Sequence, residues 1–189
     1  MPPTLPGRRD QGWGSRGNVG DVKPVDVLGV RVEMPTNQPI VLLRERDGDR
    51  YLPIWIGAAE ATAIAYAQQG VVPPRPLTHD LLKDIVDGLG HVITEIRIVE
   101  LKDKGFYALL VFEGGHEISA RPSDAIAIAL RTSTEIFVAD AVLDEAGVAL
   151  TPDEDDEVER FREFLDQVSA EDFENPSSTG PGEESPPQS

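Results

Sequence analysis

Several residue types that carry common protein chemistry are scarce or missing in this chain of 189 residues. It contains no cysteine, which excludes a disulfide framework, a thiolate zinc site and a cysteine nucleophile. Its three histidines, His79, His91 and His116, are too few and too scattered for a histidine-rich metal site. Aromatic residues make up only 6%, which leaves little for platforms on which nucleic-acid bases stack. The candidate sites are therefore built from carboxylate, histidine and arginine side chains.

Long apolar segments are also missing. No apolar run reaches membrane-spanning length, and the first seven residues lack the apolar core of a secretory signal. We therefore expect a cytoplasmic protein that has no contact with a membrane. The sequence has no Walker phosphate loop, dinucleotide-binding glycine pattern, His-Glu-x-x-His motif or nucleophile elbow. The length favours a single domain.

The net charge of −17 is unevenly distributed. Residues 153–189 hold 13 acidic residues and two arginines, a net charge of −11, and residues 25–152 carry −8. An acidic body disfavours tight non-specific binding of nucleic acid through phosphate neutralisation. Chemistry on a phosphate would then need a metal ion to bridge like charges.

Composition divides the chain into one structured body and weakly apolar ends. We expect residues 1–22 and 173–189 to be disordered, because they are rich in Gly, Pro and polar residues. Residues 23–150 predict a single α+β domain. Residues 151–172 open on the capping pattern Thr151-Pro152-Asp153-Glu154 and predict an acidic amphipathic helix.

Alternation of apolar and polar residues, with turn signals between, predicts the elements of the body. The predicted strands cover residues 25–34, 39–45, 50–56, 91–101, 106–112, 116–120 and 136–139. The predicted helices cover residues 58–69, 80–87 and 122–131. Thr78 is the expected cap of the second helix, and Trp55 is expected in the core or in an interface.

An internal repeat is visible at a spacing of 64 residues, where segment 54–65 aligns with segment 118–129. Five of the twelve aligned positions are identical, and Glu60 aligns with Asp124. Each copy follows three predicted strands. The sequence therefore predicts two β-β-β-α units in tandem.

Three junctions that lead into helices each place an acid in the first helical turn: Glu60, Asp80 and Asp124. If the repeat holds, Glu60 and Asp124 occupy equivalent places, where two carboxylates would hold Mg²⁺ or Mn²⁺ through oxygen ligands. Such a metal polarises a phosphodiester and generates the attacking hydroxide. His79 would then act as general base or as partner of a metal ligand, and Arg121 would stabilise developing phosphate charge.

Each of these residues also has a purely structural explanation. An acid in the first turn of a helix complements the helix dipole and caps free amides, worth ~0.3–1 kcal/mol. With Gly57 and Arg121 as N-caps, Glu60 and Asp124 both fall at the third helical position, from which a carboxylate reaches back to the cap. In this alternative His79 is an exposed residue beside a cap, and Arg121 pairs with a neighbouring carboxylate.

Three motifs, in order along the chain, together resemble those of the bifunctional nuclease family, which was long known only as a domain of unknown function. They are Leu52-Pro53-Ile54-Trp55-Ile56-Gly57 with Glu60-Ala61, Arg75-Pro76-Leu77-Thr78-His79-Asp80-Leu81, and Arg121-Pro122-Ser123-Asp124-Ala125-Ile126-Ala127. The resemblance covers about residues 22–150. It implies a β/α/β layered fold of duplicated β(3)-α units, a metal-assisted activity on DNA and RNA, and self-association into a homo-oligomer.

The sequence thus favours a metal-assisted nuclease of low sequence specificity. Glu60 and Asp124 would hold the metal, His79 would handle a proton, Arg121 would meet phosphate, and Asp80 would assist the chemistry or join the ligands. The alternative is a non-enzymatic regulatory or interaction module that binds a small anionic ligand or a partner protein. The acidic body, the few aromatics and the absence of a basic stripe favour that alternative.

Overall fold

The structure, a computed structural model, describes residues 20–149. The acidic helix expected at 151–172 and the tail expected at 173–189 lie outside the described residues, as do residues 1–19 of the N-terminal segment. The described chain is a mixed α+β domain, as predicted.

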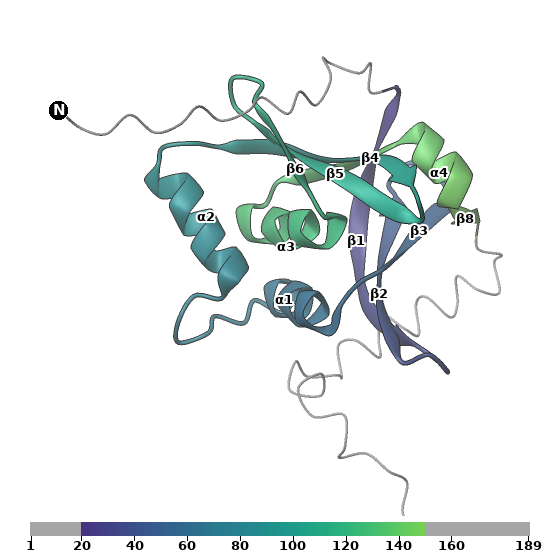
Figure 1. The fold of residues 1–189 in the computed structure, drawn as a ribbon, viewed down its shortest axis with the longest axis horizontal. Coiled ribbons are helices and arrows are strands. Elements are labelled where there is room, and N and C mark those ends of the chain that lie inside the picture. The colour runs from purple at the N-terminus through teal and green to yellow at the C-terminus, as the bar shows by residue number, and fades with distance from the viewer. Residues whose placement is uncertain (1–19, 150–189) are drawn as a thin grey trace, which may run out of the picture.

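One mixed sheet contains all the strands of the described chain. The strands are β1 (Val22–Glu33), β2 (Gln38–Glu45), β3 (Arg50–Trp55), β4 (Ile93–Lys102), β5 (Gly105–Phe112), β6 (Glu117–Ala120), β7 (Glu135–Ala139) and β8 (Val148–Ala149). The helices are α1 (Ala58–Gln68), α2 (Thr78–Gly88), α3 (Pro122–Thr132) and α4 (Asp140–Ala146). The strand order is β6-β5-β4-β7-β1-β2-β3-β8, so the antiparallel meanders β1-β2-β3 and β4-β5-β6 form the two halves of the sheet and β7 joins them (Figure 1). Only the β4–β7 pair is parallel among the described strands.

The two predicted β-β-β-α units are present. Helices α1 and α3 each have 11 residues, and their first residues, Ala58 and Pro122, are 64 positions apart. Gly57 and Arg121 are the N-caps, as predicted, and both have extended backbone, with φ −79° and ψ 160° at Gly57 and φ −70° and ψ 142° at Arg121. The same chain path therefore leads from strand to helix in both copies.

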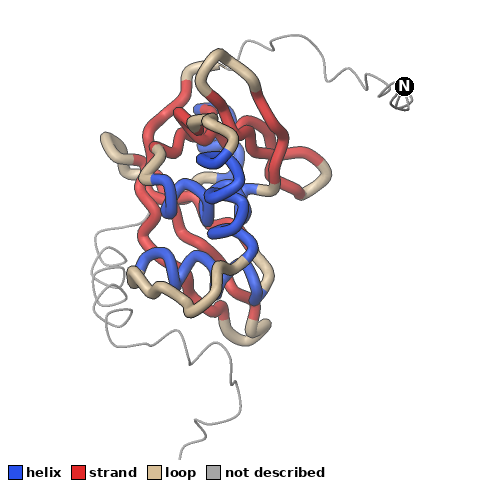
Figure 2. The backbone as a smooth tube through the Cα atoms, turned by 90° about the vertical axis from the view of Figure 1, so that its left-hand side faces the viewer, coloured by secondary structure: helices blue, strands red, loops and turns tan. Residues whose placement is uncertain are grey.

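Helices α1 and α3 pack against each other in the centre of the domain (Figure 1). Helix α1 contacts β1 and β2, while α3 contacts β4, β5 and β7, so the twisted sheet covers the helix pair from two sides (Figure 2). Alanine-rich helices keep their backbones close to neighbours, and the isoleucines Ile64, Ile126 and Ile128 fill the space between layers, fully buried. Burying each such side chain contributes about 1.5–3 kcal/mol.

The start of α2 differs from the prediction. The helix begins at Thr78 with Leu77 as its N-cap, so Thr78 is not the cap. The reason is that Asp80, at the third helical position, accepts a hydrogen bond from the backbone N–H of Leu77 at 2.8 Å. A carboxylate that reaches back to the N-cap residue thus caps α2, in place of the hydroxyl cap expected from Thr78.

The sequence predicted neither α4 nor β8. Of the two places expected for Trp55, the core is wrong, and an interface stays a prediction. Helix α4 is short, and contacts with distant parts of the chain hold it: Val142 and Leu143 are buried, and Arg50 pairs with Asp140. Trp55 ends β3 with 54% of its surface exposed. Within residues 20–149, no helix is both long enough and apolar enough to cross a membrane.

Candidate functional site

Four of the five candidate residues meet where the N-termini of α1, α2 and α3 approach one another. The guanidinium of Arg121 donates from Nη2 to Glu60 Oε1 at 2.7 Å. It also donates from Nε and Nη2 to the two carboxylate oxygens of Asp124, at 2.8 and 3.0 Å. His79 Nε2 lies 3.1 Å from Asp124 Oδ1. We call these four residues the Arg121 network.

The duplicated fold explains how the Arg121 network assembles. Glu60 and Asp124 both stand at the third position of their helices, and α1 and α3 lie side by side. Helix α2 packs against α3, which brings His79 from the first turn of α2 to Asp124. The three motifs, far apart in sequence, therefore contribute to one place because their helices start at one place.

Asp124 is the centre of the charge arrangement. Burial alone would raise the pKa of its carboxyl, but the hydrogen bonds from Arg121 and His79 outweigh burial and hold the pKa below its ordinary value. The hydrogen bonds to Asp124 and then to Glu60 raise the pKa of Arg121 further above neutrality. Asp124 is thus an anion at neutral pH.

An anionic Asp124 fixes the tautomer of a neutral His79 ring. A carboxylate only accepts hydrogen bonds, so the proton of the neutral imidazole must be on Nε2, next to Asp124. The lone pair is then on Nδ1. An imidazole oriented by a carboxylate is the arrangement that a general base requires.

Asp80 does not join the Arg121 network. Its carboxylate accepts from Leu77 N–H and is paired with Arg131 of α3. Burial works to raise the pKa of Asp80, but the hydrogen bonds from Arg131 and Leu77 prevail and lower it. Arg131 also donates to the backbone oxygens of Ala63 at 3.0 Å and Ala127 at 2.8 Å.

Arg131 therefore connects α3 with α1 and with the start of α2. Its partner on α2, Asp80, is the residue next to His79 in the sequence. The Arg131 side chain is only 8% exposed. From the sequence, Arg131 was predicted only as the last residue of a helix. Its position could have indicated a role near the site. Arg131 lies seven residues, or two helical turns, after Asp124, on the same face of a helix otherwise rich in alanine and isoleucine.

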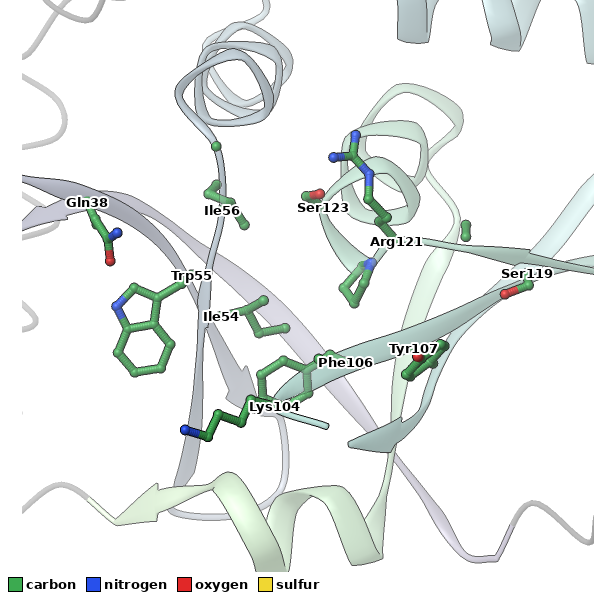
Figure 3. Close-up of a pocket in the computed structure, with 14 residues that line it drawn as sticks. Gln38, Ile54, Trp55, Ile56, Lys104, Phe106, Tyr107, Ser119, Arg121 and Ser123 are labelled. Carbon is green, nitrogen blue, oxygen red and sulfur yellow. The ribbon is translucent and has the colours of Figure 1, made fainter. Parts of the chain in front are cut away.

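A cleft of about 720 Å³ opens between the two strand-to-helix junctions. Its polar and aromatic lining includes Trp55, Lys104, Tyr107, Ser119, Arg121 and Ser123, drawn in Figure 3. Arg121 belongs to both the cleft and the network, so the Arg121 network stands at the edge of this cleft. Neither Lys104 nor Tyr107 was predicted as a site residue, since the sequence pattern predicted only a turn at Lys104 and a strand at Tyr107.

Glu60 and Asp124 have the oxygen ligands that Mg²⁺ and Mn²⁺ prefer. In this arrangement, however, one guanidinium bonds to both carboxylates and offsets one of their two negative charges. Within residues 20–149, no three side chains of His, Asp or Glu are grouped as a metal site would need. The pair as arranged does not fit a divalent cation, which would bind there only after Arg121 had turned away.

Comparison with known proteins gives the family. The family model of the bifunctional nuclease domain matches residues 41–151, more than half of the chain. This chain belongs to the bifunctional nuclease domain family. The matched range contains Glu60, His79, Arg121 and Asp124, so the bifunctional nuclease domain of this protein carries the whole Arg121 network.

Similar individual proteins include one uncharacterized protein and two that are named bifunctional nucleases. An uncharacterized protein of Mycobacterium tuberculosis strain H37Rv is 57% identical over 159 residues, which cover 79% of this chain and 96% of the relative. Bifunctional nuclease 1 of Oryza sativa subsp. indica is 30% identical over 118 residues, 59% of this chain and 35% of the rice protein. Bifunctional nuclease 2 of Oryza sativa subsp. japonica is 32% identical over 108 residues, 53% of this chain and 33% of the relative. The match to the rice proteins thus spans about a third of their length.

Proposed function

We propose that this protein is a nuclease that hydrolyses phosphodiester bonds of nucleic acid at the Arg121 network. The observation that carries the proposal is the His79–Asp124–Arg121 contact at the edge of a cleft. It combines a carboxylate-oriented imidazole with a guanidinium that lines the cleft. A phosphodiester needs both groups, one for a proton and one for negative charge.

In the proposed reaction, Nδ1 of His79 takes a proton from a water molecule whose oxygen attacks phosphorus. The new phosphorus–oxygen bond forms, the bond to the ester oxygen breaks, and that oxygen takes a proton from solvent. Arg121 stabilises the negative charge that grows on the phosphate oxygens. Asp124 orients His79, Glu60 holds Arg121, and Asp80 with Arg131 positions the start of α2. None of these contacts reads a base, which supports low sequence specificity.

Dependence on Mg²⁺ or Mn²⁺ is a separate part of the proposal. Because Arg121 lies between the two candidate ligands, its release from Glu60 and Asp124 on binding a phosphate would be the event that frees the carboxylates. Cleavage measured with Mg²⁺, with Mn²⁺ and with EDTA tests this part directly. Undiminished cleavage in EDTA would mean that the side chains of the Arg121 network catalyse hydrolysis without a metal ion.

The test of the function is cleavage of labelled single- and double-stranded DNA and RNA by highly purified protein. Asp124→Asn, which keeps the shape of the side chain, should lose cleavage while the thermal unfolding temperature stays close to that of wild type. Asp87→Asn on the outer surface of α2 is the matched control and should cleave normally, since Lys83 is the one ion-pair partner of Asp87 among residues 20–149.

Two results would contradict the proposal. Equal traces of cleavage by wild type and Asp124→Asn would mean a contaminant, and the interaction module would become the better explanation. Unfolding of Asp124→Asn would make Asp124 a structural residue. Self-association and a cytoplasmic location are also proposals, and light scattering on the full chain measures the first.

A further inference from the structure

The cleft beside the Arg121 network has an aromatic wall. Trp55 lines it at the end of β3, opposite Ile40 of β2. Its indole Nε1 donates to Glu33 Oε2 at 2.9 Å, which fixes the orientation of a ring that is more than half exposed. An exposed aromatic ring with a fixed orientation is a surface on which a nucleic-acid base stacks.

Lys104 lies on the same wall and has an unusual backbone. Lys102 pairs with Gly105, so Asp103 and Lys104 form a two-residue hairpin turn, and both have positive φ, 51° and 64°. Such turns favour asparagine or glycine, and a lysine in this region is strained. Residues in such backbone conformations cluster at active sites and ligand-binding sites, so the surroundings of the side chain decide whether it has a function.

The surroundings of Lys104 indicate such a function. Its exposed side chain has no ion-pair partner among residues 20–149, and the charged residues that line the cleft are Lys104 and Arg121, with no Asp or Glu. In Figure 3 the Lys104 side chain extends toward the side where Trp55 lies, and Arg121 stands across the cleft. The lining therefore offers one cation beside the aromatic ring and a second one at the Arg121 network.

We propose that the substrate enters as a single strand: the base of an unpaired nucleotide stacks on Trp55, Lys104 binds its phosphate, and the strand continues across the cleft to Arg121. This inference rests on the proposed function, because Arg121 marks where the scissile phosphate lies. A duplex stacks its bases against each other inside the helix, so only an unpaired base can lie against Trp55. The cleft, at about 720 Å³, is within the size range of sites for small organic ligands.

The test measures binding apart from cleavage. Phosphorothioate-linked oligonucleotides of mixed sequence, which resist hydrolysis, are titrated as single strands and as duplexes. The chain has two tryptophans, so Trp13→Phe leaves Trp55 as the reporter. The single strand should quench Trp55 fluorescence and bind at least about tenfold more tightly than the duplex.

Variants locate the contacts. Trp55→Ala should weaken single-strand binding roughly 5- to 150-fold. Lys104→Gly should also weaken single-strand binding. It should lower the slope of log affinity against log salt concentration by about one, the amount expected for the loss of one phosphate contact. The same Lys104→Gly change should leave the thermal unfolding temperature unchanged or raise it, because glycine adopts φ 64° without strain. A merely structural lysine would not give this combination of weaker binding with equal or higher stability.

Asp103→Gly is the matched control in the same turn, at φ 51°. It relieves the same kind of backbone strain but keeps Lys104, so it should not weaken binding. Equal affinity for single strands and duplexes, or unchanged binding by Trp55→Ala and Lys104→Gly, overturns the inference. If cleavage then still depends on Asp124, the proposed function stands alone. If neither cleavage nor binding occurs with any nucleic acid, both fail.

Discussion

The two strand-to-helix junctions share a backbone but differ in what their side chains do. Gly57 and Arg121 cap helices of equal length with similar angles, and Glu60 and Asp124 follow three residues later. Yet Glu60 bonds to Arg121, whereas Asp124 bonds to Arg121 and to His79. The duplicated scaffold supplies two equivalent carboxylates. The differences between the copies add the other members of the Arg121 network.

Two differences are decisive. The second copy has an arginine where the first has a glycine, and this arginine reaches both carboxylates. Helix α2, which lies between the copies in sequence, packs on α3 and so delivers His79 to Asp124. In the proposed reaction the chemistry is therefore concentrated on the second copy, and the first copy supports it.

The carboxylates should not be equivalent in activity. Asp124→Asn should reduce cleavage about 10³-fold, because it changes the partner of His79 and one anchor of Arg121 together. Glu60→Gln should reduce it only about tenfold, since it weakens one contact of Arg121. Initial rates at saturating substrate, with unfolding temperatures alongside, measure both. Equal losses would mean that the two copies act symmetrically, as in a two-carboxylate metal site.

Arg121→Gly makes the second junction resemble the first. Cleavage should fall about 10²-fold, as for loss of one group that stabilises transition-state charge. Glycine is accepted at an N-cap, so the fold should persist. The pKa of Asp124 should rise once the Arg121 hydrogen bond is gone. Calorimetry with Mn²⁺ decides the metal proposal: tighter binding by this variant would identify Glu60 and Asp124 as ligands, and no binding would argue against them.

Gly57→Ala disturbs the first junction alone. A Cβ at position 57 would stand 2.3 Å from Glu60 Oε2, so the carboxylate must move away from its place beside Arg121. The displaced group is the end of a flexible side chain, and stability should change by less than about 1 kcal/mol. Activity should fall, but no further than in Glu60→Gln. A loss of activity as large as that of Asp124→Asn would show that Glu60 does more in the reaction than hold Arg121.

The ion pairs of Arg50 mark another difference, because they exist in the first copy only. Arg50 bonds to the buried Glu45 and to Asp140 and Asp144 of α4, whereas Leu109 and Gly114 stand 64 residues beyond Glu45 and Arg50. The Arg50 hydrogen bond, opposed by burial, holds the pKa of Glu45 below its ordinary value. The unfolded chain therefore takes up this proton first, and stability should fall as pH drops below about 4.5.

Glu45→Gln checks this effect by thermal unfolding across pH. The variant should unfold a few degrees lower than wild type at neutral pH, and its unfolding temperature should fall less steeply in acid. Parallel curves for the two proteins would place the acid sensitivity elsewhere.

Local patterns were enough to predict most elements of the body. The strands of both meanders and the N-caps Gly57 and Arg121 depend on neighbours in sequence, and the repeat at 64 residues follows from comparing two segments of the chain. The structure confirms all of them. Helix α4 and strand β8 were missed because tertiary contacts hold them: Val142 and Leu143 are buried, and Val148 pairs with Tyr51 of β3. Whether Trp55 is buried or exposed depends on what covers the end of β3, which no local pattern states.

The candidate site shows the same division. The pattern of residues was enough to predict that acids stand in the first turns of three helices and that Glu60 and Asp124 are equivalent, since capping is a local property and the repeat is visible in the chain itself. Packing in three dimensions was needed to show that Arg121 bonds to both carboxylates, that His79 contacts Asp124 while Asp80 pairs with Arg131, and that Lys104 and Trp55 line one cleft. The side-chain contacts join residues up to 61 positions apart, and the packing of α1, α2 and α3 against one another sets their geometry. The pairing of strands places Trp55 and Lys104.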